Sequence, residues 1–248
     1  EQPRRCGHLP ALHSGASIEQ STCVPREVVG VKVEVWSDVA CPWCYIGKRR
    51  FAEGVRRYRE AGGDQDIEVE YHSFELAPDV PEGFDGSVID YLSKRRGIPV
   101  AQVHEMIDRV SELANAEGID ADFHAVHQTR TLKAHELLHL AKERGVQEPM
   151  KERLLSAYFV EGRHVGQVDT LADMAVEVGL DRAEVLDALA NGTYVADVQA
   201  DIDQARAYGI SGVPFFVIDG RYGISGAQSP GSFAAGLTQA AGDRVAPL

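Results

Sequence analysis

The chain of 248 residues is 44% hydrophobic and 25% charged, a composition typical of a globular protein with one large domain or two small ones. Its formal net charge of -13 argues against general binding of nucleic acid or anionic membranes. No apolar run approaches the ~20 residues that a membrane-spanning helix needs, and four cysteines are too few for a disulfide scaffold. We therefore expect a cytoplasmic protein, either a monomer or a homodimer.

The first 30 residues show no clean hydrophobic period and carry Pro, Gly, Ser and His. We expect residues 1–30 to form a flexible N-terminal extension. Cys6 and Cys23 lie in this segment. We interpret them as incidental thiols, and a regulatory disulfide between them is the alternative, because spacing alone cannot establish a pairing.

A strand, a helix and a second strand follow. Residues 31–36 alternate Val with charged residues and end in Trp, which predicts a strand, and residues 67–74 predict another. Between them, the segment CPWC at 41–44 opens a helix whose apolar residues share one face. This order predicts a parallel strand pair with a right-handed crossover. We interpret the basic residues at 48–50 and 56–57 as one solvated helix face.

Helical patterns dominate the middle of the chain. The predicted helices cover residues 87–96, 99–117, 130–144, 148–159, 169–178 and 182–190. Asp169 is expected to cap the fifth of these helices. A further helix at 193–209 precedes a hairpin with the turn Asp219-Gly220, and a last helix starts at Pro230 with Ser229 as its cap.

The order of elements predicts an α/β fold in which one small sheet carries helices on both faces. Residues 31–80 and 193–243 would form this discontinuous sheet domain. Residues 81–192 would form an inserted, all-helical subdomain. The two cysteines of CPWC would lie where the first strand ends and the first helix begins.

The position of the CPWC cysteines suggests distinct roles for them. A helix start favours a thiolate, because its unpaired N–H groups and the helix dipole stabilise negative charge. Cys41 is at that start, and the fixed φ of Pro42 suits the first helical turn. We expect Cys44 to be more buried, with a higher pKa. Cys41 would then attack a substrate disulfide and Cys44 would resolve the mixed disulfide.

Other interpretations of these residues remain open. The pair could be half of a metal site or two inert thiols, but no second ligand pair follows at the spacing of a structural zinc site. Asp38 could tune the pKa of Cys41 or relay protons, although capping or solvation is the simpler role. Pro214 directly precedes an apolar strand. A cis bond between Val213 and Pro214 would leave the Val213 backbone free to pair with a substrate, whereas a trans proline would simply start the strand.

The segment HELLH at 135–139 matches a zinc-hydrolase motif. His135 and His139 would be the ligands, Glu136 the general base, and Glu161 or His164 a third ligand. The surrounding sequence is an ordinary amphipathic helix, so we rank this hypothesis below the redox one. His164 could alternatively line the cleft or belong to a surface loop.

The combination of CPWC at a helix start with GVPFF before a hairpin resembles the DsbA-like branch of the thioredoxin superfamily. It is most similar to the FrnE-type members, which are grouped with 2-hydroxychromene-2-carboxylate isomerases and kappa-class glutathione transferases. The matching segments span about 32–240 and include SDVACPWCYIGKRRF, HSFELAPDVP, TLKAHELLHLAKERG, SAYFVEGRHVGQVDTLADMAVEVGLD and ARAYGISGVPFFVIDGRYGISGAQS.

The resemblance implies a thioredoxin fold with a helical insert, a cis Pro214, and thiol–disulfide exchange at Cys41 and Cys44. Pro42, Trp43, Val213 and Pro214 would contact the substrate. The isomerases and transferases have Ser where this chain has Cys41, which disfavours their reactions here. DsbA has a His at the position of Trp43, and indole cannot act as a cationic neighbour, so we expect a weaker oxidant.

These features predict a thiol–disulfide oxidoreductase that acts on protein or small-molecule thiols and disulfides. We expect no bound metal or organic cofactor, and glutathione or another low-molecular-weight thiol as a co-substrate. A thiol-dependent isomerase or transferase on the same fold is the main alternative. A redox sensor that oxidises once without turnover is another.

Overall fold

The computed structural model describes residues 30–81, 84 and 86–245. Cys6 and Cys23 therefore lie outside the described residues. Within this part of the chain, no helix is long and apolar enough to cross a membrane.

A four-stranded mixed sheet forms the centre of the fold, with the strand order β2-β1-β5-β6. β1 (Val31–Ser37) pairs in parallel with β2 (Ile67–Ser73), as the sequence predicted. β5 (Phe215–Ile218) runs antiparallel to β1 and forms a hairpin with β6 (Tyr222–Ser225). The expected turn closes this hairpin, with positive φ angles of 53° at Asp219 and 63° at Gly220.

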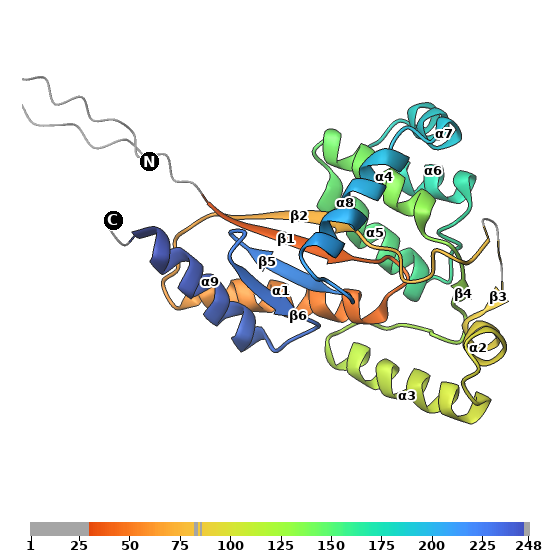
Figure 1. Cartoon of the computed structure of the whole chain (residues 1–248), viewed down its shortest axis with the longest axis horizontal. Helices are drawn as coiled ribbons and strands as arrows, with labels where there is room; N and C mark the ends of the chain where they lie inside the picture. Colours follow the sequence, from red (N-terminus) through yellow and green to blue (C-terminus); the bar gives the residue numbers. More distant parts are fainter. Residues whose placement is uncertain (1–29, 82–83, 85, 246–248) are drawn as a thin grey trace, which may run out of the picture.

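Helices cover both faces of this sheet (Figure 1). α1 (Pro42–Glu60) and α9 (Pro230–Val245) pack together on one face. Their core contains stacked and edge-on rings: Phe216 lies 5.4 Å from Phe51 and 4.7 Å from Phe233 between ring centroids. The Ser229 hydroxyl accepts a hydrogen bond from the N–H of Ser232 at 3.2 Å, so its predicted capping role is confirmed.

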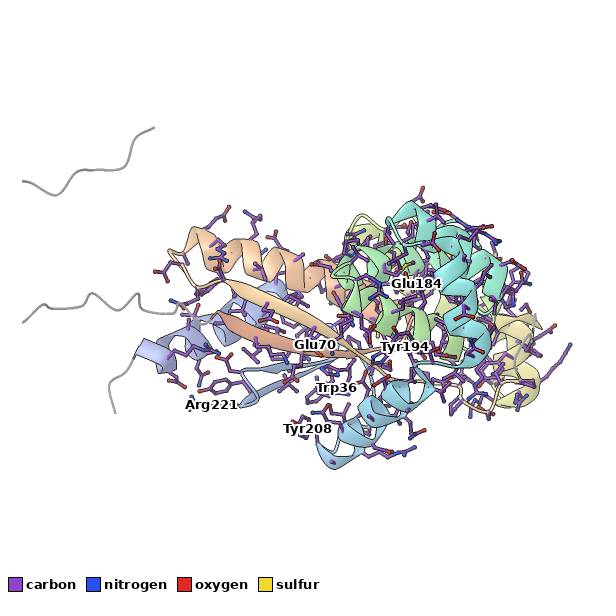
Figure 2. The ribbon with its side chains drawn as sticks, turned by 90° about the horizontal axis from the view of Figure 1, so that it is seen from above. Trp36, Glu70, Glu184, Tyr194, Tyr208 and Arg221 are labelled. Atoms are coloured by element: carbon purple, nitrogen blue, oxygen red, sulfur yellow. The ribbon has the colours of Figure 1, made fainter. Side chains whose placement is uncertain are left out.

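α8 (Val195–Ala207) covers the opposite face and contacts β2. Trp36 is fully buried there. Its ring stacks on His72 at 4.5 Å and meets the edge of Tyr208 at 5.6 Å. Figure 2 labels Trp36 on the sheet and Tyr208 at the end of α8. The two faces of the sheet therefore have separate apolar cores, which the alternation of side chains along β1 supplies.

The inserted segment contains most of the helices. They are α2 (Val88–Asp90), the π-helix η1 (Tyr91–Arg95), α3 (Val100–Ala116), α4 (Leu132–Glu143), α5 (Gln147–Phe159), α6 (Val168–Glu177) and α7 (Arg182–Asn191). Figure 1 shows α3 at the outer edge of the molecule, while α4 to α7 gather at the end of the sheet.

Two details of the insert differ from the sequence prediction. The insert is not all-helical, because β3 (Gly86–Ser87) and β4 (His127–Gln128) form a short antiparallel ladder. Strands of two residues are too short to produce an alternating pattern. The capping position of α6 is Gln167, so Asp169 lies within the first turn. There its carboxylate faces the positive end of the helix dipole.

The basic residues of α1 divide into two groups, which corrects the prediction of a single solvated face. Lys48 and Arg49 bind Glu152 of α5 at 3.0 and 2.5 Å, and Arg50 binds Glu117 at 2.6 Å. The first group therefore ties the sheet domain to the insert. The second group, Arg56 and Arg57, pairs with Glu53 on the exposed side of α1.

Candidate active site

Cys41 occupies the capping position of α1, directly after the turn that follows β1. Its backbone is extended, and the N–H of Cys44 donates to the Cys41 carbonyl at 3.0 Å. No side chain of the described residues caps this helix start, and its first turn contains no acidic residue. The N–H groups of the first turn can therefore stabilise negative charge at the Cys41 sulfur.

The loop before β5 brings Val213 and Pro214 to Cys41. The peptide bond between Val213 and Pro214 is cis, as the resemblance implied. The Cys41 Sγ lies 3.7 Å from the Val213 carbonyl oxygen, within the range of a thiol hydrogen bond. Gly47 permits this approach, because a Cβ at position 47 would lie 2.9 Å from Cγ of Pro214. Gly47 could not be identified from the sequence, since a glycine inside a helix indicates no partner.

The two thiols are equally buried, each 3% exposed, so the prediction that Cys44 would be the more buried one is wrong. Their pKa values also differ from the prediction. A hydrogen bond with Cys44 and burial raise the pKa of Cys41 well above its usual range. Burial also raises the pKa of Cys44, but the hydrogen bond from Cys41 and the charge of Lys151 outweigh it and lower that pKa. The dithiol pair therefore releases one proton readily and holds the second firmly.

Lys151 is a site residue that no sequence pattern indicated. It projects from α5, is 1% exposed, and donates from Nζ to the Ser37 carbonyl at 3.4 Å. Burial lowers the pKa of Lys151, while the negative charges of Cys44 and Asp38 oppose that shift. A lysine in an amphipathic helix ordinarily lies in solvent. Only the packing of α5 against the end of β1 places its charge beside the thiols.

Asp38 is buried beside the pair, at 1% exposure, so of the two simpler roles predicted for it, capping and solvation, solvation is wrong. Its carboxylate accepts hydrogen bonds from the N–H groups of Leu76 at 2.8 Å and Ala40 at 3.3 Å. His135 Nε2 lies 3.3 Å from the same carboxylate. Burial raises the pKa of Asp38, but its hydrogen bond with His135 and the charge of that ring outweigh burial and lower it. The ionised carboxylate in turn contributes to the raised pKa of Cys41.

The residues of HELLH have separate structural partners. His135 contacts Asp38, whereas His139 lies 3.2 Å from Asp201 of α8. Glu136 is fully buried and pairs with Lys133 at 2.8 Å. The proposed third ligands lie in other contacts: Glu161 binds Arg153, and His164 Nε2 lies 3.1 Å from the Phe84 carbonyl. No group of three or more metal-ligating side chains occurs within the described residues.

The four predicted substrate contacts lie at two places around Cys41. The Val213 carbonyl lies beside its sulfur, and Pro214 follows Val213 and faces Gly47 of α1. Pro42 and Trp43 instead line a cavity of about 600 Å³ between the start of α1 and the insert. Trp43 is 41% exposed, so its indole is available to a bound molecule.

Residues 32–238 match the family model of the DSBA-like thioredoxin domain. The chain belongs to this family. It shares 39% of its residues with a probable DsbA oxidoreductase from Streptomyces coelicolor, whose crystal structure superposes with a TM-score of 0.81 over 88% of this chain and 92% of that one. It is also 32% identical over 192 residues to the uncharacterized protein YwbO of Bacillus subtilis strain 168, covering 76% of this chain and 86% of YwbO.

Two solved structures of lower sequence identity share the fold. The structure of 2-hydroxychromene-2-carboxylate isomerase is 14% identical with a TM-score of 0.61, covering 86% of this chain and 95% of that one. The structure of the cytosolic disulfide reductase DsbM of Pseudomonas aeruginosa with GSH is 21% identical with a TM-score of 0.57. The match covers 84% of this chain and 98% of that one. The thioredoxin fold and the DsbA-like resemblance are confirmed.

Proposed function

We propose that this protein is a thiol–disulfide oxidoreductase in which Cys41 and Cys44 alternate between dithiol and disulfide. The observation that carries the proposal is the pair of thiols at an uncapped helix start, with Cys41 against Val213 and Cys44 near a buried lysine charge. Two inert core thiols would need neither the helix start nor the buried charges around them.

The exchange proceeds in two steps. The Cys41 thiolate attacks one sulfur of a substrate disulfide, and the other sulfur leaves as a thiolate that takes up a proton. The Cys44 thiolate then attacks the Cys41 sulfur and releases the second substrate thiol. Two electrons pass from the dithiol to the substrate, and the reverse sequence oxidises a substrate dithiol.

The charges around the pair support both steps. The lowered pKa of Cys44 favours a single negative charge on the reduced pair. Because the two sulfurs share one hydrogen-bonded proton, that charge can pass to Cys41 when the proton moves to Cys44. The helix start then stabilises the Cys41 thiolate for attack. Lys151 stabilises the charge again on Cys44 during resolution.

The proposal includes a protein or small-molecule disulfide as the substrate, and glutathione or a similar thiol as the co-substrate. It includes no metal or organic cofactor. The relative that was determined with GSH is described as a cytosolic disulfide reductase, which supports glutathione as the first thiol to test. We propose the cytoplasm as the compartment because the chain has few cysteines, and cell fractionation tests this part.

The test is equilibration of the full chain with a glutathione redox buffer, followed by turnover of a disulfide substrate. A reversible Cys41–Cys44 disulfide with repeated turnover is expected. Cys41→Ser should abolish turnover, whereas the matched variants Cys6→Ser and Cys23→Ser should retain it. Absence of the disulfide would refute the proposal. A disulfide that forms once without turnover would favour the redox sensor, and activity that survives Cys44→Ser would favour the thiol-dependent isomerase or transferase.

A further inference from the structure

The cavity beside Cys41 has the dimensions of a small-molecule site. Its volume of about 600 Å³ lies within the range of roughly 300–1,000 Å³ that ligand pockets occupy. Ala40 and Pro42, the neighbours of Cys41 in the chain, line it together with Trp43. Side chains of α3 form the facing wall, among them Met106 and Arg109.

The wall of the cavity is mainly apolar, both at its buried end and at its mouth. Ile107 and Phe159 line its buried part, with exposures of 5% and 2%. Trp43, Leu76 and Met106 also line it and are 41%, 44% and 46% exposed. Large apolar side chains left in solvent around one opening are typical of a binding site.

The charges of the cavity differ between its two ends. Asp38 lies at the buried end, and its carboxylate is ionised and already bound to backbone N–H groups. Arg109 is exposed and makes no salt bridge within the part of the chain that the structure describes. Arg96, which also lines the cavity, instead binds the Tyr91 hydroxyl at 2.6 Å. An anionic group is therefore favoured beside Arg109 and disfavoured beside Asp38.

A peptide does not fit this wall well. Each peptide unit brings an N–H and a C=O group that need partners when buried. Among the residues that line the cavity, few neutral polar side chains are present, such as Gln128, Thr129 and Thr131. A molecule without backbone amides avoids this cost.

We infer that the cavity binds a small, mainly apolar molecule with one anionic group, whose body packs against Trp43 and whose anion lies beside Arg109. Binding itself follows from the shape and charge of the cavity. That the bound molecule is a substrate rests on the proposed function. In that case the preferred substrates are apolar, acidic, low-molecular-weight disulfides or thiols.

The binding test compares two fluorescent probes that differ by one charge. 1-Anilinonaphthalene-8-sulfonate is an apolar anion, and N-phenyl-1-naphthylamine is its neutral counterpart. We expect both to bind the native full chain at one site, the anion more tightly. The anion should also raise the melting temperature, because a ligand of the native state stabilises it. Binding at many sites, or binding that lowers the melting temperature, would overturn the inference.

Two sets of variants locate the site. Arg109→Gln should lower the affinity for the anionic probe up to about fivefold and leave the affinity for the neutral probe unchanged. Arg59→Gln removes the same charge from the far end of α1 and should change neither probe. Leu113→Trp, which fills the cavity, should lower the affinity for both probes by at least about tenfold. If Leu113→Trp does not fold, Met106→Glu replaces it as the cavity variant, and Val176→Glu on α6 is the exposed control for Met106→Glu. Unchanged binding in the Arg109 and cavity variants would overturn the inference.

The substrate test uses two aromatic disulfides, the dianionic 5,5′-dithiobis(2-nitrobenzoate) and the neutral 4,4′-dithiodipyridine. Each rate constant is divided by that of dithiothreitol with the same disulfide, to remove differences in intrinsic reactivity. Arg109→Gln should lower the ratio of the anionic to the neutral rate by about fivefold, while Arg59→Gln should not. An unchanged ratio would overturn the substrate class. Exchange with glutathione but no probe binding would refute only the cavity site, and probe binding without any exchange would refute only the proposed function.

Discussion

Gly47→Ala tests whether the contact between α1 and Pro214 positions the active site. Replacing a glycine by alanine inside a helix stabilises it by about 1 kcal/mol. At position 47, however, the new Cβ would lie 2.9 Å from Cγ of Pro214, whereas carbon atoms in contact prefer about 3.5–4.0 Å. The proline ring is rigid, so the loop must move away from α1.

The expected cost of this overlap is about 1–3 kcal/mol, so Gly47→Ala should be neutral or destabilising by up to about 2 kcal/mol. Moving Pro214 also moves the Val213 carbonyl, which lies 3.7 Å from the Cys41 sulfur. We therefore expect slower disulfide exchange as well as lower stability. Urea unfolding gives the free energy, and stopped-flow mixing with a disulfide gives the rate.

Gly242→Ala is the matched control, because Gly242 lies in α9 and a Cβ there would have no described residue within 4 Å. This variant should gain the helical stabilisation and keep the exchange rate. Equal stabilisation of both variants, with unchanged exchange in Gly47→Ala, would show that the contact with Pro214 does not position the site.

Three further variants test the buried charges and the core. Lys151→Met should raise the pKa of Cys44 and make the redox potential more negative, because the thiolate loses its cationic neighbour; thiolate absorbance and glutathione titration measure both. Asp201→Asn should make the free energy of unfolding fall less steeply as the pH is lowered. The pKa of Asp201 is lowered despite burial, through hydrogen bonds from His139 and His72. The ionised Asp201 therefore stabilises the fold above about pH 4, and this stabilisation is lost as the pH falls. Phe233→Ala, at a fully buried ring, should cost about 3–5 kcal/mol in urea unfolding.

Exposed residues supply the controls for these variants. Lys94→Met should leave the thiolate absorbance unchanged, since Lys94 pairs with Asp90 on the surface. Asp203→Asn, on the exposed side of α8, should leave the fall in stability at low pH as it is in the wild type. Val195→Ala should cost little stability, because that side chain is 41% exposed. Identical curves for Asp201→Asn and the wild type would show that the buried carboxylate is not the source of acid sensitivity.

Local patterns in the sequence were sufficient for the framework of the site. The alternation at 31–36 predicted β1, Asp219-Gly220 predicted the hairpin turn, and CPWC was correctly placed at the start of α1. Each of these features depends on residues within a few positions of one another. The period of a strand or helix and the backbone angles of a turn are properties of such short segments, so they can be inferred without knowing the fold.

The electrostatics of the site and its cavity arise only in the tertiary structure. Lys151 is separated from Cys44 by more than 100 positions in the chain, and His135 is similarly far from Asp38. In the sequence, Lys151 has the pattern of an exposed helical lysine and HELLH that of a metal motif. Their burial, their partners and the pKa values of the thiols follow from how α4 and α5 pack against the end of β1. A charge acts on a thiol through distance and desolvation, and both are set by packing.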